Sequence, residues 1–124
     1  MVVTRQRVLV IEDDEDIRSA VVEYLSEVGG FDVAAAENGA AGLARLTEGP
    51  LPGAVLVDST MPVLDGAGTI ARIRANPAWA SIPVIVSSAD PLAPALGGDR
   101  CITKPFSVDD LLTVLREVLP DDIA

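Results

Sequence analysis

Two short apolar runs in the sequence end in acidic residues. Residues 54–57 (AVLV) are followed at once by Asp58, and residues 8–11 (VLVI) are followed by Glu12 and Asp13. Such runs are typical of strands that are buried on both faces of a sheet. Because the acids come where the strands end, their carboxylates can emerge together at one edge of the sheet. Three carboxylates, in a chain without histidine, form an all-oxygen ligand set that suits Mg²⁺ better than zinc or copper.

A structural role explains part of this acidity. Residues 12–16 (EDDED) are five acids in a row, and Ile17, Val21 and Leu25 follow at helical spacing. Carboxylates at a helix N-terminus accept hydrogen bonds from free amides and suit the helix dipole, so some of the five serve as caps. Adjacent acids repel one another, however, unless a cation or a cationic side chain lies nearby. Asp58 taken alone is better explained as a capping residue in a loop, and only the residues around it favour a reactive carboxylate.

Two further polar residues follow candidate strands. Ser88 comes after residues 84–86 (VIV), and Lys104, the only lysine of the chain, comes after residues 100–103 and before a proline. Beside a hydrated Mg²⁺, an ammonium and a hydroxyl form a receptor for phosphate oxygens, and an aspartate can act as a nucleophile that becomes an acyl phosphate. The alternative for Lys104 is an ordinary surface lysine.

Length and composition limit the class of protein. The chain has 124 residues, enough for one domain with a single core. Its net charge of −10 argues against direct binding of nucleic acid. A single cysteine rules out an internal disulfide and suits a reducing cytoplasm. No stretch approaches the ~18 apolar residues of a membrane span, and no secretory signal pattern is present. We therefore expect a cytoplasmic protein without membrane insertion.

The order of elements predicts an α/β fold. Strand patterns alternate with helical patterns five times, which indicates a doubly wound five-stranded parallel sheet with helices on both faces. In such sheets, ligands bind beyond the carboxyl ends of the strands. Every predicted strand except the second delivers a polar or charged group to that edge. The helical pattern is degraded only at residues 90–100, where two prolines and two glycines fall within eight residues.

Four segments carry a resemblance to a known family. They are VLVIED at 8–13, DSTMPVLDG at 58–66, PVIVSSA at 83–89 and KPF at 104–106. Together they resemble the CheY-like receiver domain of response regulators in two-component signalling and phosphorelay systems. The resemblance runs from about residue 7 to residue 119 of a single domain, residues 1–124, and implies a flavodoxin-like strand order 2-1-3-4-5.

The resemblance assigns a role to each polar residue. Asp58 is the expected phosphoacceptor, which takes a phosphoryl group from a partner histidine kinase or histidine phosphotransfer protein. Asp13 and Asp58 are expected to bind Mg²⁺ directly, Glu12 through water, and Thr60 through its backbone carbonyl. Lys104 would pair with a phosphoryl oxygen, next to a cis Lys104–Pro105 bond, and Ser88 stands where the family has its switch hydroxyl. Thr60 and Asp90 would tune the lifetime of the acyl phosphate. The chain is then a regulatory domain that catalyses only its own phosphoryl transfer and dephosphorylation.

Two features depart from the family pattern. Cys101 stands where the family usually has Tyr or Phe, and we expect a packed core thiol there rather than a redox sensor. The segment from Ser88 to Lys104 is roughly two helical turns shorter than usual, so we expect the family's fourth helix to be short or missing. The usual dimer face, built from the fourth helix, fifth strand and fifth helix, should then not form in the ordinary way. The output would then run through the loop at residues 90–99, by a phosphorylation-dependent change of order, or through the first helix and its neighbours.

Other functions compete with this interpretation. The main alternative is a pseudo-receiver, an interaction scaffold that signals without phosphorylation. A phosphatase of the haloacid-dehalogenase type would need a second carboxylate two residues after Asp58, where Thr60 stands. No effector domain follows the last helix, so the chain is either a stand-alone receiver that acts by protein contacts or part of a longer protein.

Overall fold

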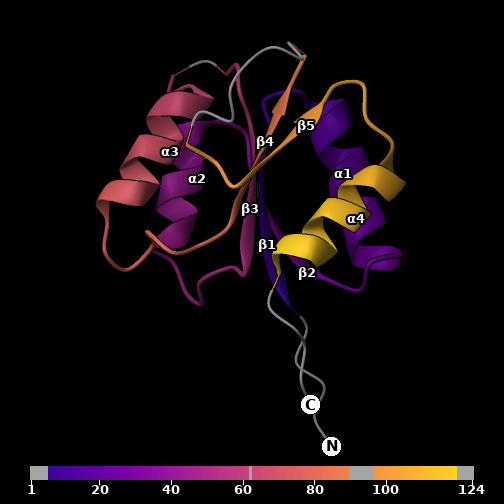
Figure 1. The fold of residues 1–124 in the computed structure, drawn as a ribbon, viewed down its shortest axis with the longest axis horizontal. Coiled ribbons are helices and arrows are strands. Elements are labelled where there is room, and N and C mark those ends of the chain that lie inside the picture. Colours follow the sequence, from indigo (N-terminus) through magenta and orange to yellow (C-terminus); the bar gives the residue numbers. More distant parts are fainter. Residues whose placement is uncertain (1–5, 62, 90–96, 120–124) are drawn as a thin grey trace, which may run out of the picture.

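The computed structural model describes residues 6–61, 63–89 and 97–119, and these residues contain five strands and four helices (Figure 1). No helix in this part of the chain is long and apolar enough to cross a membrane. The elements are β1 (Arg7–Ile11), α1 (Glu15–Glu27), β2 (Asp32–Ala36), α2 (Gly39–Leu46), β3 (Ala54–Asp58), α3 (Gly66–Ala75), β4 (Val84–Ser88), β5 (Arg100–Thr103) and α4 (Val108–Val118).

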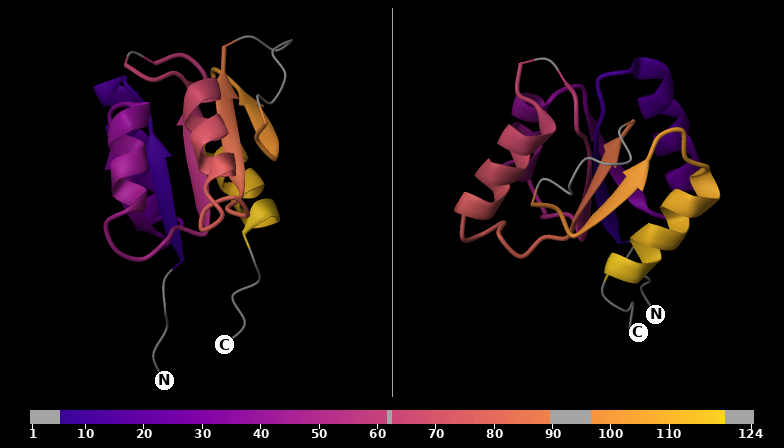
Figure 2. Two further views of the ribbon diagram at one scale, coloured as in Figure 1. Left: turned by 90° about the vertical axis from the view of Figure 1, so that its left-hand side faces the viewer. Right: turned by 45° about the horizontal axis from the view of Figure 1, so that its top comes forward.

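The strands form one parallel sheet in the order β2-β1-β3-β4-β5. Helices α1 and α4 cover one face, and α2 and α3 cover the other (Figures 1 and 2). This is the doubly wound fold and the strand order that the sequence predicted. Because all the strands are parallel, their carboxyl ends meet at a single edge of the sheet.

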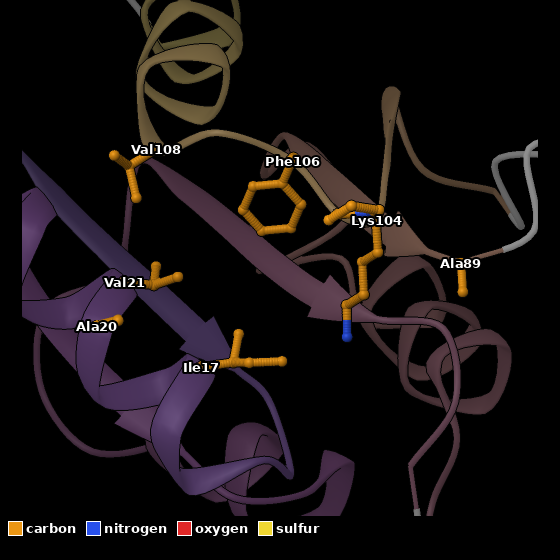
Figure 3. A pocket seen from close by; sticks show the side chains of 8 residues that line it. Ile17, Ala20, Val21, Ala89, Lys104, Phe106 and Val108 are labelled. Atoms are coloured by element: carbon orange, nitrogen blue, oxygen red, sulfur yellow. The ribbon is translucent and has the colours of Figure 1, made fainter.

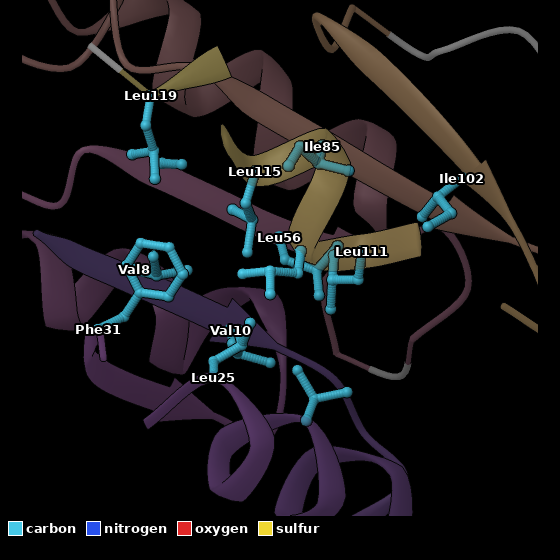
Figure 4. Packing of buried hydrophobic residues seen from close by; sticks show 13 residues of the cluster. Val8, Val10, Leu25, Phe31, Leu56, Ile85, Ile102, Leu111, Leu115 and Leu119 are labelled. Atoms are coloured by element: carbon cyan, nitrogen blue, oxygen red, sulfur yellow. The ribbon is translucent and has the colours of Figure 1, made fainter. Parts of the chain in front are cut away.

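Two apolar clusters hold the helices to the sheet. Successive residues of a strand point to opposite faces, so Val8 and Val10 of β1 pack toward α1 and α4, while Leu9 and Ile11 pack toward α2 and α3. The first cluster also contains Leu25 of α1 and three leucines of α4, which interlock over the middle of the sheet (Figure 4). Burial on both faces explains why the central strands are continuous apolar runs.

The exposure of the outer strand, β5, differs from the prediction. Cys101 is exposed, so the expectation of a packed core thiol is wrong. The reason is its place on an edge strand, where only Ile102 of the four residues reaches a core. The described residues between β4 and β5 contain no helix. Two predictions, the short or missing fourth helix and the change of order at residues 90–99, concern mostly residues 90–96, which lie outside the described part of the chain.

An arginine fastens the beginning of β5 to the rest of the fold. Nη1 of Arg74, near the end of α3, donates to the carbonyls of Ala80 and Ile82, both at 2.9 Å. Its Nη2 donates to Oδ2 of Asp99 at 2.9 Å, and the same oxygen accepts from the Val84 amide at 2.8 Å. Partial burial opposes ionisation of Asp99, but these donors outweigh it and lower the pKa of the carboxyl group. Arg74 therefore joins α3, β4 and the approach to β5.

Replacing Arg74 with methionine tests this role. We expect Arg74→Met to lower the free energy of unfolding by about 2 kcal/mol, because Asp99 and three backbone carbonyls, those of Ala80, Ile82 and Gly97, lose a charged donor. The measurement is urea unfolding at neutral pH. Arg72→Met is the matched control, since Arg72 lies on the same helix, is exposed, and its side chain makes no hydrogen bond or ion pair with the described residues. Equal losses in the two variants would contradict the assigned role.

Candidate functional site

The acidic run after β1 divides into a cap and a site. Oδ1 of Asp14 accepts hydrogen bonds from the amides of Asp16 and Ile17, at 2.9 and 3.1 Å, and so caps α1. Glu12, in contrast, is buried, with only 4% of its surface exposed, and Asp13 lies beside it at the sheet edge. Capping therefore explains only the later acids, and the first two are free to build a site.

Arg18 is a residue of this region that the sequence analysis missed. Its Nη1 donates to the backbone carbonyl of Glu12 at 2.9 Å and, at the 3.5 Å limit, to that of Asp13. These bonds hold the two peptide units whose side chains face the site. Its position in the sequence could have indicated this role, because Arg18 lies one turn into α1 and side chains there point back toward the preceding loop.

Backbone contacts with β4 and with the beginning of α3 fix the position of Asp58. It is the last residue of β3 and is 5% exposed. The Ser59 amide donates to the Ser87 carbonyl at 2.8 Å, and the Gly66 amide donates to the Ser59 carbonyl at 3.2 Å. A Cβ atom at Gly66 would lie 2.6 Å from the carbonyl oxygen of Asp58, so only glycine lets α3 begin this close to the site.

Lys104 lies between two of the carboxylates. Its Nζ is 2.9 Å from Oε1 of Glu12 and 3.2 Å from Oδ1 of Asp58. Its own amide donates to the carbonyl of Ser88 at 2.7 Å, and the Lys104–Pro105 bond is cis. Since the side chain is only 21% exposed, water screens these ion pairs weakly.

The carboxylates form a group that fits a hard cation. One oxygen from each of Glu12, Asp13 and Asp58 lies within 4.8 Å of the others. Among the described residues, one ammonium, that of Lys104, lies against these three carboxylates. The four groups together carry a charge of −2 when all of them are ionised. An all-oxygen set with one exposed member, Asp13, suits Mg²⁺, which keeps several waters when it binds.

The pKa values reflect this crowding. Burial raises the pKa of Glu12, the hydrogen bond from Lys104 works against that shift, and the charge of Asp58 adds to it. Slight burial of Asp13 is outweighed by its interactions with Glu12 and Asp58, which lower its pKa. Burial likewise opposes the charge of Lys104, but its bonds to Glu12 and Asp58 raise its pKa. Lys104 is therefore a permanent cation of the site.

The other predicted site residues lie on the same edge. Ser88 ends β4 and is buried, 4% exposed, with its carbonyl bound to the Lys104 amide. Thr60 is exposed in the loop between β3 and α3, two residues after Asp58. The structure thus brings Glu12, Asp13, Asp58 and Lys104 close together. It places Ser88 beside Lys104 through the pairing of β4 with β5, and Thr60 two residues after Asp58 in the chain.

A pocket that the sequence did not indicate opens beside Lys104. It has a volume of about 400 Å³ and lies between α1 and the segment that joins β5 to α4 (Figure 3). Tyr24 of α1 donates a hydrogen bond to Asp109 of α4 and so ties the two helices together. The lining residues are Ile17, Ala20, Val21, Ala89, Lys104, Pro105, Phe106 and Val108.

The first prediction from the site concerns Lys104 as a competitor for the metal. Removing the ammonium leaves three carboxylates without their counterion, so Lys104→Met should strengthen Mg²⁺ binding on the order of 3- to 10-fold. Isothermal titration with MgCl₂ measures this. Arg100→Met changes the net charge equally at the other end of the same strand, β5, where Arg100 pairs with Glu117, and should leave the affinity unchanged. Unchanged or weaker Mg²⁺ binding in Lys104→Met would refute the competition.

The second prediction concerns strain in the loop after β3. Val63 has φ = 70° and is 81% exposed, the only non-glycine residue with positive φ in the described part of the chain. A β-branched residue is disfavoured there, whereas asparagine adopts this conformation readily. Val63→Asn should therefore raise the free energy of unfolding by about 1 kcal/mol in urea. Val63→Thr keeps the branched Cβ, so an equal gain in that control would exclude relief of strain as the cause.

Comparison with known proteins identifies the family. The family model described as "Response regulator receiver domain" matches residues 8–116. Protein PilG of Pseudomonas aeruginosa is 38% identical over 120 residues, which are 92% of this chain and 87% of PilG. The transcriptional regulatory protein PrrA of Mycobacterium tuberculosis is 37% identical over 123 residues, which are 94% of this chain but only 51% of PrrA.

Solved structures agree with these relatives. The chemotaxis response regulator CheY4 of Vibrio cholerae superimposes with a TM-score of 0.85 at 26% identity, covering 94% of this chain and all of CheY4. The receiver domain of the sensor histidine kinase PA1611 of Pseudomonas aeruginosa, a structure with a magnesium ion coordinated in its active-site cleft, gives 0.82 at 25% identity and covers 93% and 98% of the two chains. The chain therefore belongs to the response regulator receiver domain family.

Proposed function

We propose that this receiver domain, which spans about residues 7–119, accepts a phosphoryl group on Asp58 with the help of Mg²⁺. The observation that carries the proposal is the contact of three carboxylates with one ammonium at the carboxyl edge of the sheet. No structural need of the fold calls for this arrangement, because burying like charges costs stability. Phosphoryl transfer to Asp58 brings negatively charged phosphoryl oxygens to this carboxylate, which accounts for both the cation site and the lysine.

Each residue has a distinct part in the proposed reaction. Asp13 and Asp58 would hold Mg²⁺ directly, Glu12 would act through water, and Thr60 would contribute its backbone carbonyl. The bound metal neutralises charge on the phosphoryl oxygens during transfer. A carboxylate oxygen of Asp58 forms a bond to phosphorus, and the bond between phosphorus and the histidine nitrogen of the donor breaks, so that the imidazole leaves with the electron pair and takes up a proton. Lys104 shifts from pairing with the Asp58 carboxylate to pairing with a phosphoryl oxygen. The hydroxyl of Ser88 donates a hydrogen bond to the phosphoryl group and so senses its arrival.

The partners follow from the family and from the charge of the chain. The proposed phosphoryl donor is a histidine kinase or a histidine phosphotransfer protein in the cytoplasm, and the output is a change of protein contacts. The net charge of −10 disfavours direct contact with nucleic acid. Cys101 is exposed on β5, and the described residues between β4 and β5 contain no helix, so we do not expect the usual dimer through the fourth helix, fifth strand and fifth helix.

Intact mass spectrometry tests the proposed function. Wild-type protein treated with phosphoramidate should gain one phosphoryl group when Mg²⁺ is present and almost none in EDTA. Asp58→Asn should gain none, because an amide is not a nucleophile. Asp16→Asn removes an exposed acid of the same run outside the carboxylate group and should react like wild type. If the wild type stays unmodified although it binds Mg²⁺, the domain is a phosphorylation-independent scaffold instead.

A further inference from the structure

The backbone carbonyls of Glu12 and Asp13 lie between the sheet and helix α1. The pairing of β1 with its two neighbouring strands ends at Ile11. The amide of Glu12 still donates to the carbonyl of Ala36 on β2, at 3.1 Å. The two carbonyls that follow come after the paired part of the strand, and α1 begins only at Glu15. This short connection carries two members of the carboxylate group.

One residue of α1 binds this whole connection. The Nη1 atom of Arg18 donates to the Glu12 carbonyl at 2.9 Å, and it reaches the Asp13 carbonyl at 3.5 Å, the outer limit of a hydrogen bond. The backbone amide of Arg18 donates to the Asp14 carbonyl at 2.8 Å. Three successive carbonyls therefore face donors of the same half-buried residue, which fastens the connection to the helix.

The side chain of Arg18 binds carbonyls and no carboxylate. Residues 13–16 (DDED) come just before it, yet it forms no ion pair with any described residue. A guanidinium paired with the Asp13 carboxylate would occupy oxygens that a cation needs, as Lys104 does at Glu12 and Asp58. Arg18 instead fixes the backbone and leaves the carboxylate oxygens to the cation.

We propose that Arg18 is a positioning residue of the cation site, which raises the affinity for Mg²⁺ by holding Glu12 and Asp13 in place before the ion binds. The inference rests on the Mg²⁺ site of the function proposed above, and it adds a residue that touches neither the cation nor the phosphoryl group. Partners that orient the ligands of a metal change its affinity by about 10- to 100-fold. Because Arg18 binds the backbone and not the carboxylates, we expect the lower end of this range.

The charge of Arg18 and its contacts have opposite effects on the cation, so the sign of the change identifies the role. The guanidinium is positively charged and lies against the peptide units of two acidic residues of the site. If it acted only through its charge, it would repel Mg²⁺, and its removal would strengthen binding. If it positions the ligands, its removal leaves the ion to order the connection. That ordering costs conformational entropy, so binding becomes weaker.

Isothermal titration with MgCl₂ tests the inference without any phosphoryl donor. Arg18→Met removes the donors and the charge but keeps a long side chain that favours helix, and it should raise the dissociation constant by about tenfold. This is the opposite sign to the change expected for Lys104→Met. Arg116→Met is the matched control, because Arg116 is exposed in the last turn of α4, away from the end of that helix that follows Lys104. It should keep the wild-type dissociation constant.

Two further measurements separate positioning from a general loss of stability. In EDTA, hydrogen exchange of the amides of residues 13–15 should become at least about tenfold faster in Arg18→Met, while that of residues 55–57 in β3 stays the same, because only the connection is released. With phosphoramidate as the donor, the half-saturating Mg²⁺ concentration should rise about tenfold. The rate at saturating Mg²⁺ should be unchanged, because the bound ion then holds the ligands itself.

The outcomes decide between positioning and charge. Mg²⁺ binding in Arg18→Met that is as tight as in the wild type, or tighter, overturns the positioning role. An equal loss of affinity in Arg116→Met also overturns it, because the effect would then not depend on contact with the carbonyls. Faster exchange in β3 as well would show a global loss of stability instead. If the wild type binds Mg²⁺ but accepts no phosphoryl group, the proposed function fails while the titrations still decide the role of Arg18. If the wild type binds no Mg²⁺, both fail.

Discussion

The contact of one ammonium with two buried carboxylates is the interaction on which the site depends. Glu12 comes from the end of β1, Asp58 from β3 and Lys104 from β5. Strand β4 separates β3 from β5, and it ends in Ser88 rather than in a large side chain. The long lysine side chain can therefore reach past β4 to Asp58. Without that cation, two carboxylates that are about 95% buried would repel each other where little water solvates them. This repulsion would lower the free energy of unfolding of a fold that is only marginally stable, so the site needs the counterion.

Backbone contacts around the site keep these charges in place. Arg18 holds the carbonyls of Glu12 and Asp13, and Gly66 lets α3 begin against the carbonyl of Asp58. At the other end of β5, Arg74 and Asp99 fix the approach to the strand that carries Lys104. The charged side chains thus emerge from rigid elements and not from long loops, which reduces the reorganisation needed when a cation or a phosphoryl group arrives.

The sequence predicted the sheet and the site because both depend on local pattern. Buried parallel strands are continuous apolar runs, and Glu12, Asp13, Asp58 and Lys104 mark where those runs end. The predicted burial of Cys101 was wrong, because the burial of an edge strand depends on which element covers it. The sequence of the strand itself does not reveal that covering element. The pocket beside Lys104 and the bonds of Arg18 were missed for a related reason. Each is made by residues that look like ordinary members of a helix or a loop until the fold brings them together.

Lys104 also links the phosphoryl site to the surface of the domain. In this structure its side chain contacts Asp58 and forms part of the pocket wall between α1 and α4. A group that draws the ammonium toward Asp58 changes the shape of that wall, and a molecule in the pocket changes how freely the ammonium can move. The two events are therefore thermodynamically linked, and each must affect the other by the same free energy. Lys104, which contacts Asp58 and lines the pocket, is therefore a side chain through which the charge state of Asp58 can reach the surface.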